Sequence, residues 1–174
     1  GQSKDALSKN RAGAWEYDVM YPAYKCNMTN INAAIGIAQL DRYDGLLKRR
    51  RELNENYRNA LEKLGLKVMH HYTDEMTSTG HLYLVRIPGA SVEDRNAVIQ
   101  DMAERGIACN VHYKPLPMMT AYKNLGFDIK DYPNAYHQYE NLISLPVFST
   151  MTDEQNAYVI ENFADILKKR GLIK

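Results

Sequence analysis

A long run of apolar residues at helical spacing is the feature that most constrains this chain. Between Thr29 and Leu64, apolar side chains recur every three or four residues, which is the spacing of one face of an α-helix. Thr29 can accept an otherwise unpaired backbone N–H, and Gly65 can adopt the left-handed conformation that ends a helix. The pattern predicts one helix over residues 29–65, about 50 Å long and therefore longer than a small domain. A bend near Asp44-Gly45 is the main alternative to one continuous helix, because glycine in a helix costs about 1 kcal/mol relative to alanine.

Residues 1–28 show no such pattern and are expected to form an arm or loop. Polar residues, Gly13 and Pro22 surround a short aromatic stretch, and neither a helical nor a strand period is sustained. The chain begins with Gly1 rather than methionine, which leaves a shortened, a proteolysed and a naturally split protein all open. The intact mass of the native gene product would distinguish these cases.

Residues 66–174 have the pattern of a small α+β domain. Strands are expected at residues 66–69, 81–87, 107–113 and 143–145, and helices at residues 91–106 and 136–142 and from residue 152 onward. Ser91 and Thr152 are the expected N-caps of two of these helices. Short strands separated by helices predict a largely antiparallel sheet with helices on one face.

Composition excludes several classes of protein. The 174 residues include 22 basic and 21 acidic side chains, so a net charge of +1 gives no general positive field for nucleic acid or an anionic membrane. No apolar run approaches the roughly 20 residues that a membrane-spanning helix needs. Cys26 and Cys109 are far apart and form no CxxC pair, which fits a reducing compartment better than a disulfide. We therefore expect a cytoplasmic protein with neither nucleic acid nor membrane as a partner.

Two clusters admit both a functional and a structural interpretation. The basic run at residues 48–51 could bind phosphate or nucleic acid, but acidic residues within helical reach favour a solvated helix face. His70, His71 and His81 could bind a metal, but adjacent histidines point in different directions and no Cys or carboxylate completes a known spacing. We expect no metal site.

Common catalytic motifs are missing from the sequence. The glycines form neither GxGxxG nor GxxxxGK[ST], and no GxSxG nucleophile elbow is present. The residues alone therefore reveal no complete catalytic set.

Two short stretches remain candidates for ligand binding. Lys25 and Asn27 come directly before the helix start at Thr29, where free N–H groups and the helix dipole favour an anion such as phosphate. Simple capping of the helix is the alternative. His112 and Tyr113 end a predicted strand and lead into a loop stiffened by proline, where side chains on a rigid scaffold often face a ligand. A structural role for the histidine is the alternative there.

Residues 23–36, which read AYKCNMTNINAAIG, resemble a specific segment of the DegT/DnrJ/StrS family of pyridoxal-phosphate-dependent nucleotide-sugar aminotransferases. Ala23 replaces the family's usual glycine, and Lys25 stands where many members have asparagine. Further matching motifs follow in the family's order and spacing: QLD at 39–41, KRR at 48–50, HLY at 81–83, GI at 106–107, HYKPL at 112–116, LISLPVF at 142–148 and MT at 151–152. The resemblance covers the chain from about residue 17 onward.

The resemblance implies the α/β architecture of fold-type-I pyridoxal-phosphate transferases, in which a long helix joins a large cofactor-binding domain to a small C-terminal α+β domain. This chain is similar to the latter part alone: residues 1–28 would be a remnant of the large-domain boundary, residues 29–65 the linking helix and residues 66–174 the small domain. In the family, the lysine that binds the cofactor covalently and the acidic residue that pairs with its ring nitrogen both precede the stretch matching residues 24–34. No catalytic residue is therefore assigned, and the chain alone is expected to be inactive.

The resemblance implies that the complete protein is a homodimer that transfers an amino group from glutamate to a nucleotide-linked keto-sugar. This reaction would serve surface polysaccharide or lipopolysaccharide biosynthesis. By resemblance, Asn27 reaches the phosphate of the pyridoxal 5'-phosphate cofactor in the neighbouring subunit, assisted by Lys25. His112 and Tyr113 match a pair that lines the substrate side of the cleft. The alternative hypothesis is a stand-alone, non-catalytic interaction or regulatory domain derived from the same fold.

Overall fold

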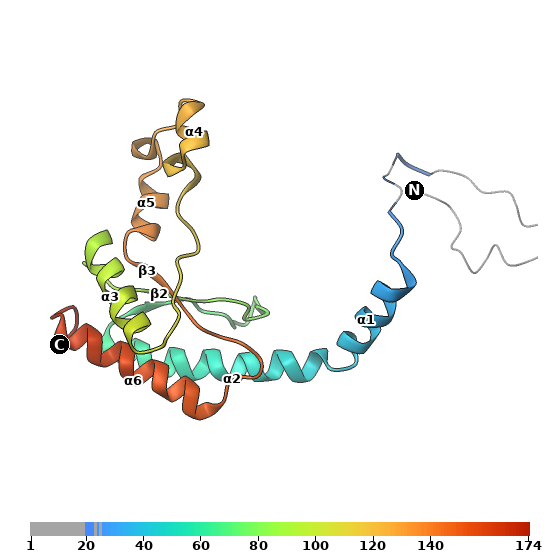
Figure 1. Cartoon of the computed structure of the whole chain (residues 1–174), viewed down its shortest axis with the longest axis horizontal. Helices are drawn as coiled ribbons and strands as arrows, with labels where there is room; N and C mark the ends of the chain where they lie inside the picture. Colours follow the sequence, from blue (N-terminus) through green and yellow to red (C-terminus); the bar gives the residue numbers. More distant parts are fainter. Residues whose placement is uncertain (1–19, 23, 25) are drawn as a thin grey trace, which may run out of the picture. The chain divides into compact units, whose positions relative to one another are not determined.

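The computed structural model describes residues 20–22, 24 and 26–174 and separates into two units, residues 1–41 and residues 42–174 (Figure 1). The described part of the first unit contains one helix, α1 (Asn30–Leu40). As expected, Thr29 caps α1, because its hydroxyl accepts the backbone N–H of Asn32 at 3.2 Å. No residue of α1 is buried.

The continuous helix expected over residues 29–65 is divided in the structure. It consists of α1 and α2 (Tyr43–Leu61), followed by the short 3₁₀ turn η2 (Glu62–Leu64). Asp41 and Arg42 form the turn between the two helices, so the prediction of one continuous helix is wrong and the interruption lies just before Asp44 and Gly45. A glycine weakens every helical turn that includes it, and here the interruption falls within one turn before the glycine. The expected helix end is confirmed, since Gly65 has a φ of 76°.

The second unit contains an antiparallel sheet in the order β1-β2-β3. Its strands are β1 (Lys67–Val68), β2 (Tyr83–Arg86) and β3 (Leu142–Leu145). The strand expected at residues 107–113 is wrong, because only Asn110 pairs with β3, in a single bridge to Ser144. Ile107 is buried in the core, and beyond Asn110 the chain leaves the sheet ahead of Pro115, whose ring nitrogen cannot donate to a ladder.

The helices of the second unit begin largely where the sequence predicts. Ser91 and Thr152 form capping boxes at the starts of α3 (Val92–Glu104) and α6 (Asp153–Lys169). The helix expected at residues 136–142 begins earlier and ends earlier, because a proline occupies its first turn and β3 begins at residue 142. The intervening segment contains η3 (Leu116–Met118), α4 (Thr120–Asn124), η4 (Ile129–Asp131) and α5 (Pro133–Tyr139).

The hydrophobic core of the second unit lies on one face of the sheet. Along β2, burial alternates so that Tyr83 and Val85 face the core, and Ile143 and Leu145 of β3 join them. Residues of three helices fill the remainder: Leu53, Tyr57 and Leu61 of α2, Val98 and Met102 of α3, and Val159, Phe163, Ile166 and Leu167 of α6. Figure 1 shows α6 running beside α2 under the sheet. The opposite face of the sheet carries Leu84, Arg86 and Ser144.

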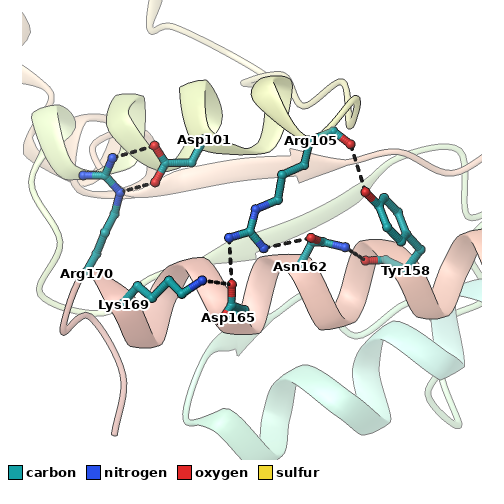
Figure 2. Close-up of polar contacts among 7 residues, drawn as sticks. All are labelled: Asp101, Arg105, Tyr158, Asn162, Asp165, Lys169 and Arg170. Atoms are coloured by element: carbon teal, nitrogen blue, oxygen red, sulfur yellow. Dashed lines mark hydrogen bonds and ion pairs between the residues drawn. The ribbon is translucent and has the colours of Figure 1, made fainter.

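Polar contacts hold α6 against α3 at the surface (Figure 2). Arg170 donates to both carboxylate oxygens of Asp101 at 2.6 and 2.7 Å, and Arg105 donates to Asp165 at 2.7 Å. Figure 2 also draws Lys169, Asn162 and Tyr158 in this network. The pKa of the Asp101 carboxyl is lowered by the hydrogen bonds from Arg170, so the pair stays ionised near neutral pH. These contacts fix the register of the two helices.

Candidate functional site

His112 lies on the face of the sheet opposite the core, next to β3. Its Nδ1 is 2.8 Å from the hydroxyl oxygen of Ser144, which is itself only 4% exposed. The backbone places the two residues together, because Asn110 pairs with Ser144 through N–H···O bonds of 3.1 and 2.7 Å. The imidazole is therefore held against β3 of the sheet, through its contact with Ser144 and the neighbouring bridge.

A cavity of about 280 Å³ lies beside His112. Its walls come from three segments: the residues before β2, the segment that follows α3, and the end of β3 with the residues after it. The lining residues are His81, Leu82, Ala108, Cys109, Asn110, His112, Ser144, Leu145, Pro146 and Val147. Burial raises the pKa of the Cys109 thiol to about 12. The thiol therefore stays protonated near neutral pH, and the polar groups available to a ligand are the imidazoles, the amide and the hydroxyl.

A second cavity, of about 370 Å³, is also lined by His112 and includes Arg86 of β2. The Arg86 guanidinium is fixed by three acceptors: the side chains of Asn141 at 2.9 Å and Gln138 at 3.1 Å, and the backbone carbonyl of His137 at 2.6 Å. These bonds tie the end of α5 to the sheet. The positive charge thus stands beside His112 in a fixed position, and none of its described partners is anionic.

Tyr113 projects from this framework. Its side chain is 73% exposed, and its ring meets the His112 ring edge to face with the centroids 4.7 Å apart. An exposed aromatic ring held on a fixed neighbour can cover an apolar or sugar surface of a ligand.

Asn27 lies in the extended segment before α1 and is exposed. The Thr29 hydroxyl occupies only one of the N–H groups at the start of α1, and no acidic side chain lies in its first turn. Lys25, the second predicted phosphate contact, lies outside the described residues. Asn27 belongs to the first unit of the structure and His112 to the second.

Two of the three histidines considered for metal binding, His70 and His71, have separate local contacts, and His81 lines the cavity beside His112. His71 is buried, and its Nδ1 is 3.1 Å from the Ser78 hydroxyl. His70 is exposed, and its Nε2 is 3.8 Å from a carboxylate oxygen of Glu62. Residues 20–22, 24 and 26–174 contain no group of three or more His, Cys, Asp or Glu side chains placed to share a metal ion.

The basic run at residues 48–51 is not simply a solvated face. Arg49 donates to the backbone carbonyl of Met151 at 2.6 Å and pairs with Asp153 at 2.9 Å. Arg51 lies over the Tyr72 ring at 4.4 Å. These arginines hold neighbouring segments against α2, which the helical spacing alone does not reveal.

Sequence reasoning missed Ser144 and Arg86 as parts of this site. Both alternate with buried apolar residues along their strands, and neither was assigned a role from the sequence. The signal that could have found them is this alternation, combined with the pairing of β2 and β3 that sets Leu84 opposite Ser144.

Comparison with known proteins identifies the family. The sequence profile of the DegT/DnrJ/EryC1/StrS aminotransferase family matches residues 4–164. The chain belongs to this family. The family resemblance noted in the sequence is therefore confirmed, and so is the fold class that it implied.

Among curated relatives of this aminotransferase-family chain, the spore coat polysaccharide biosynthesis protein SpsC of Bacillus subtilis (strain 168) is 32% identical over 174 residues, which cover 97% of this chain and 44% of SpsC. Among solved structures, the putative sugar aminotransferase Spr1654 from Streptococcus pneumoniae in its PMP-form has a TM-score of 0.80 and 50% identity over 97% of this chain and 42% of its own. Its PLP-form has a TM-score of 0.80 and 49% identity, covering 94% and 42% of the two chains. The chain thus spans less than half the length of these relatives.

No helix in the described part of this family member is long and apolar enough to cross a membrane.

Proposed function

We propose that this chain is the C-terminal part of a pyridoxal-phosphate-dependent aminotransferase that transfers an amino group from glutamate to a nucleotide-linked keto-sugar for surface polysaccharide biosynthesis. The observation that carries the proposal is the family match over residues 4–164. The names of the relatives support its two halves: one is a polysaccharide biosynthesis protein, and the other is a putative sugar aminotransferase with a PLP-form.

The residues before α1 fit the phosphate of the cofactor. The exposed Asn27 amide can donate to a phosphate oxygen, and the start of α1 offers further N–H groups with no acidic side chain in its first turn to compete. Lys25 adds a positive charge to the same stretch of sequence. When bound, pyridoxal phosphate supplies the electron-accepting ring that makes transamination possible. Asn27 would hold and orient this group from the neighbouring subunit.

The sheet face around His112 fits the sugar nucleotide. The imidazole is held by Ser144 at 2.8 Å between two cavities, and the Arg86 charge lies at one of them. His112 can hydrogen-bond a polar substituent of the substrate, and the exposed Tyr113 ring can cover it. Both residues then act in substrate binding, and neither is assigned a proton-transfer step.

The lysine and the acidic residue that transamination requires are assigned to the part of the complete protein that precedes residues 24–34, following the family resemblance. The chain alone is then inactive. Mixed with pyridoxal phosphate, the 174-residue protein should not develop the stoichiometric visible absorbance of a cofactor held covalently by one lysine. Such absorbance, lost on replacing a single lysine, would contradict this assignment.

The apolar side chains of α1 support a homodimer. Ile31 and Ile35 lie one turn apart on the same face of α1, Ile37 and Leu40 extend the apolar surface to its other sides, and all four side chains are exposed. In the complete protein this face would be covered by the large domain or by the second copy, next to the position proposed for Asn27. The cytoplasmic location expected from the sequence stays a prediction.

The reaction itself is tested with the complete protein that contains this chain. Loaded with pyridoxal phosphate, it should convert glutamate to 2-oxoglutarate and then form an amino-sugar nucleotide from a nucleotide-linked keto-sugar, which mass spectrometry detects. Formation of 2-oxoglutarate with every keto-sugar nucleotide left unchanged would overturn the substrate class. A protein that removes the amino group from no donor would overturn the reaction class.

A further inference from the structure

The structure contains two partly buried serine–histidine pairs of the same kind, and they differ in one respect. In the first pair, Nδ1 of His71 is 3.1 Å from the Ser78 hydroxyl, and its Nε2 is buried without a partner. In the second pair, Nδ1 of His112 is 2.8 Å from the Ser144 hydroxyl. Nε2 of His112 has no hydrogen-bond partner among the described residues and is not one of the buried unpaired atoms. Only the second pair presents a free ring nitrogen to a ligand.

The hydroxyl of Ser144 determines which nitrogen of His112 carries the proton. A serine hydroxyl has one hydrogen to donate, and among the described residues the His112 ring is the only hydrogen-bond partner of Ser144 Oγ. A buried hydroxyl that left its hydrogen unused would lose the free energy of that bond. The arrangement that uses this hydrogen has Ser144 donating to Nδ1, and it leaves the proton of the neutral ring on Nε2.

We propose that Ser144 is a positioning residue that fixes His112 as an Nε2–H donor, so that the sugar nucleotide is held there through an oxygen acceptor. The acceptor is a hydroxyl, carbonyl or phosphate oxygen of the substrate. This inference rests on the proposed function of the site, because it names the chemistry by which His112 recognises its substrate.

The backbone around the pair gives the positioning its rigidity. The Asn110–Ser144 bridge fixes Ser144 on one side, and its pairing with Leu84 of β2 fixes it on the other. His112 follows Asn110 by two residues, so both members of the pair are held by the same bridge. A ring held at its base by the sheet and at Nδ1 by the hydroxyl has little freedom to rotate. The free N–H thus keeps one direction before substrate arrives.

The tautomer is measured in the 174-residue chain by nitrogen-15 NMR of its five histidines. In the unaltered chain at a pH where the ring is neutral, His112 should show the Nε2–H tautomer. Ser144→Ala should shift His112 toward a mixture of both tautomers, and Ser144→Thr, which restores a hydroxyl, should return the original signal. Ser78→Ala is the matched control, because it should alter the His71 signal and leave that of His112 unchanged.

An Nδ1–H tautomer in the unaltered chain, or a His112 signal that Ser144→Ala does not change, would overturn the inference. The complete enzyme then separates this result from the proposed function. Ser144→Ala should raise KM for the nucleotide sugar about threefold to tenfold with kcat nearly unchanged, and Ser144→Thr should restore it. An altered tautomer with an unaltered KM would leave the positioning intact and overturn the assignment of His112 to substrate binding.

Discussion

The helices α1 and α2, which the sequence pattern predicts as one, differ in how far their side chains are buried. The 19 residues of α2 bury Leu53, Asn54, Tyr57 and Leu61 against the sheet and α6, whereas none of the 11 residues of α1 is buried. Yet both show apolar residues at helical spacing. The difference teaches that periodicity predicts a helix and its face, but not the surface that the face meets. For α2 that surface lies in this chain, and for α1 we propose that it lies in the complete dimer.

The same division separates the two proposed binding roles. Asn27 precedes α1 and is assigned to the cofactor, while His112 stands on the sheet that α2 helps to support and is assigned to the substrate. Variants on either side of the division should therefore have different consequences.

The largest difference is expected in stability. Leu53→Ala removes a fully buried side chain from the α2 face and should lower the free energy of unfolding by about 2–5 kcal/mol. Ile35→Ala in α1, where the side chain is 58% exposed, should change it by less than about 0.5 kcal/mol. Denaturant unfolding of the 174-residue chain measures both. Equal losses from the two variants would show that the α1 face is already covered in this chain.

The second difference concerns association. Because the apolar face of α1 is exposed, the isolated chain should self-associate, and light scattering should show a mass above 20.0 kDa that grows with concentration. Replacing Ile31 and Ile35 together by Glu should return the chain to a monomer. A monomeric unaltered chain with strong amide protection along residues 31–40 would contradict this account of α1.

The third expectation is that the stability of the second unit depends on pH through His71. Burial lowers the pKa of His71, with Glu55 opposing the shift weakly, so the unfolded chain takes up a proton at this residue at higher pH than the folded chain. The free energy of unfolding should therefore fall as the pH drops below about 6.5, the ordinary pKa of histidine. His71→Phe should reduce this slope, whereas His70→Gln, at an exposed position, should leave it nearly unchanged. An equal slope in the unaltered chain and the His71 variant would show that another group is responsible.

The smallest effect is expected at the surface of the second unit. Asp101 and Arg170 form a partly exposed pair, so Asp101→Asn should cost only about 0.2–1 kcal/mol at neutral pH. Since the pKa of Asp101 is lowered in the folded chain, its contribution should be present above about pH 4 and disappear as the pH falls further. Unfolding curves of the variant and the unaltered chain should therefore converge in acid. A constant difference between them down to low pH would mean that the carboxylate charge is not involved.

The identity of a few neighbouring residues was enough to predict where helices begin and end. Features that depend on contacts between distant residues were not predicted. The caps at Ser91 and Thr152 and the left-handed Gly65 depend on a few neighbouring residues, and all three were read correctly. The interruption at Asp41 and Arg42 was located only approximately, near Asp44-Gly45, because a single glycine shows only where a helix is weak.

The candidate site was predictable only in part, for the same reason. His112 and Tyr113 were found from a motif, but Ser144 reaches His112 only through the bridge from Asn110, which joins residues far apart in the sequence. Arg86 likewise depends on α5 folding back onto β2. The roles of Asn27 and Lys25 rest on family resemblance and stay predictions.

The most direct test of the division between cofactor and substrate compares Asn27→Ala with His112→Ala in the complete enzyme. Loss of one charge-assisted hydrogen bond of about 1.5–3 kcal/mol should weaken pyridoxal phosphate binding about tenfold to a hundredfold in Asn27→Ala. His112→Ala should leave cofactor affinity nearly unchanged and raise KM for the nucleotide sugar at saturating cofactor, which is the pattern of lost substrate binding. Cofactor titration followed by steady-state kinetics measures both. If His112→Ala weakens cofactor binding while Asn27→Ala does not, the two assignments are wrong.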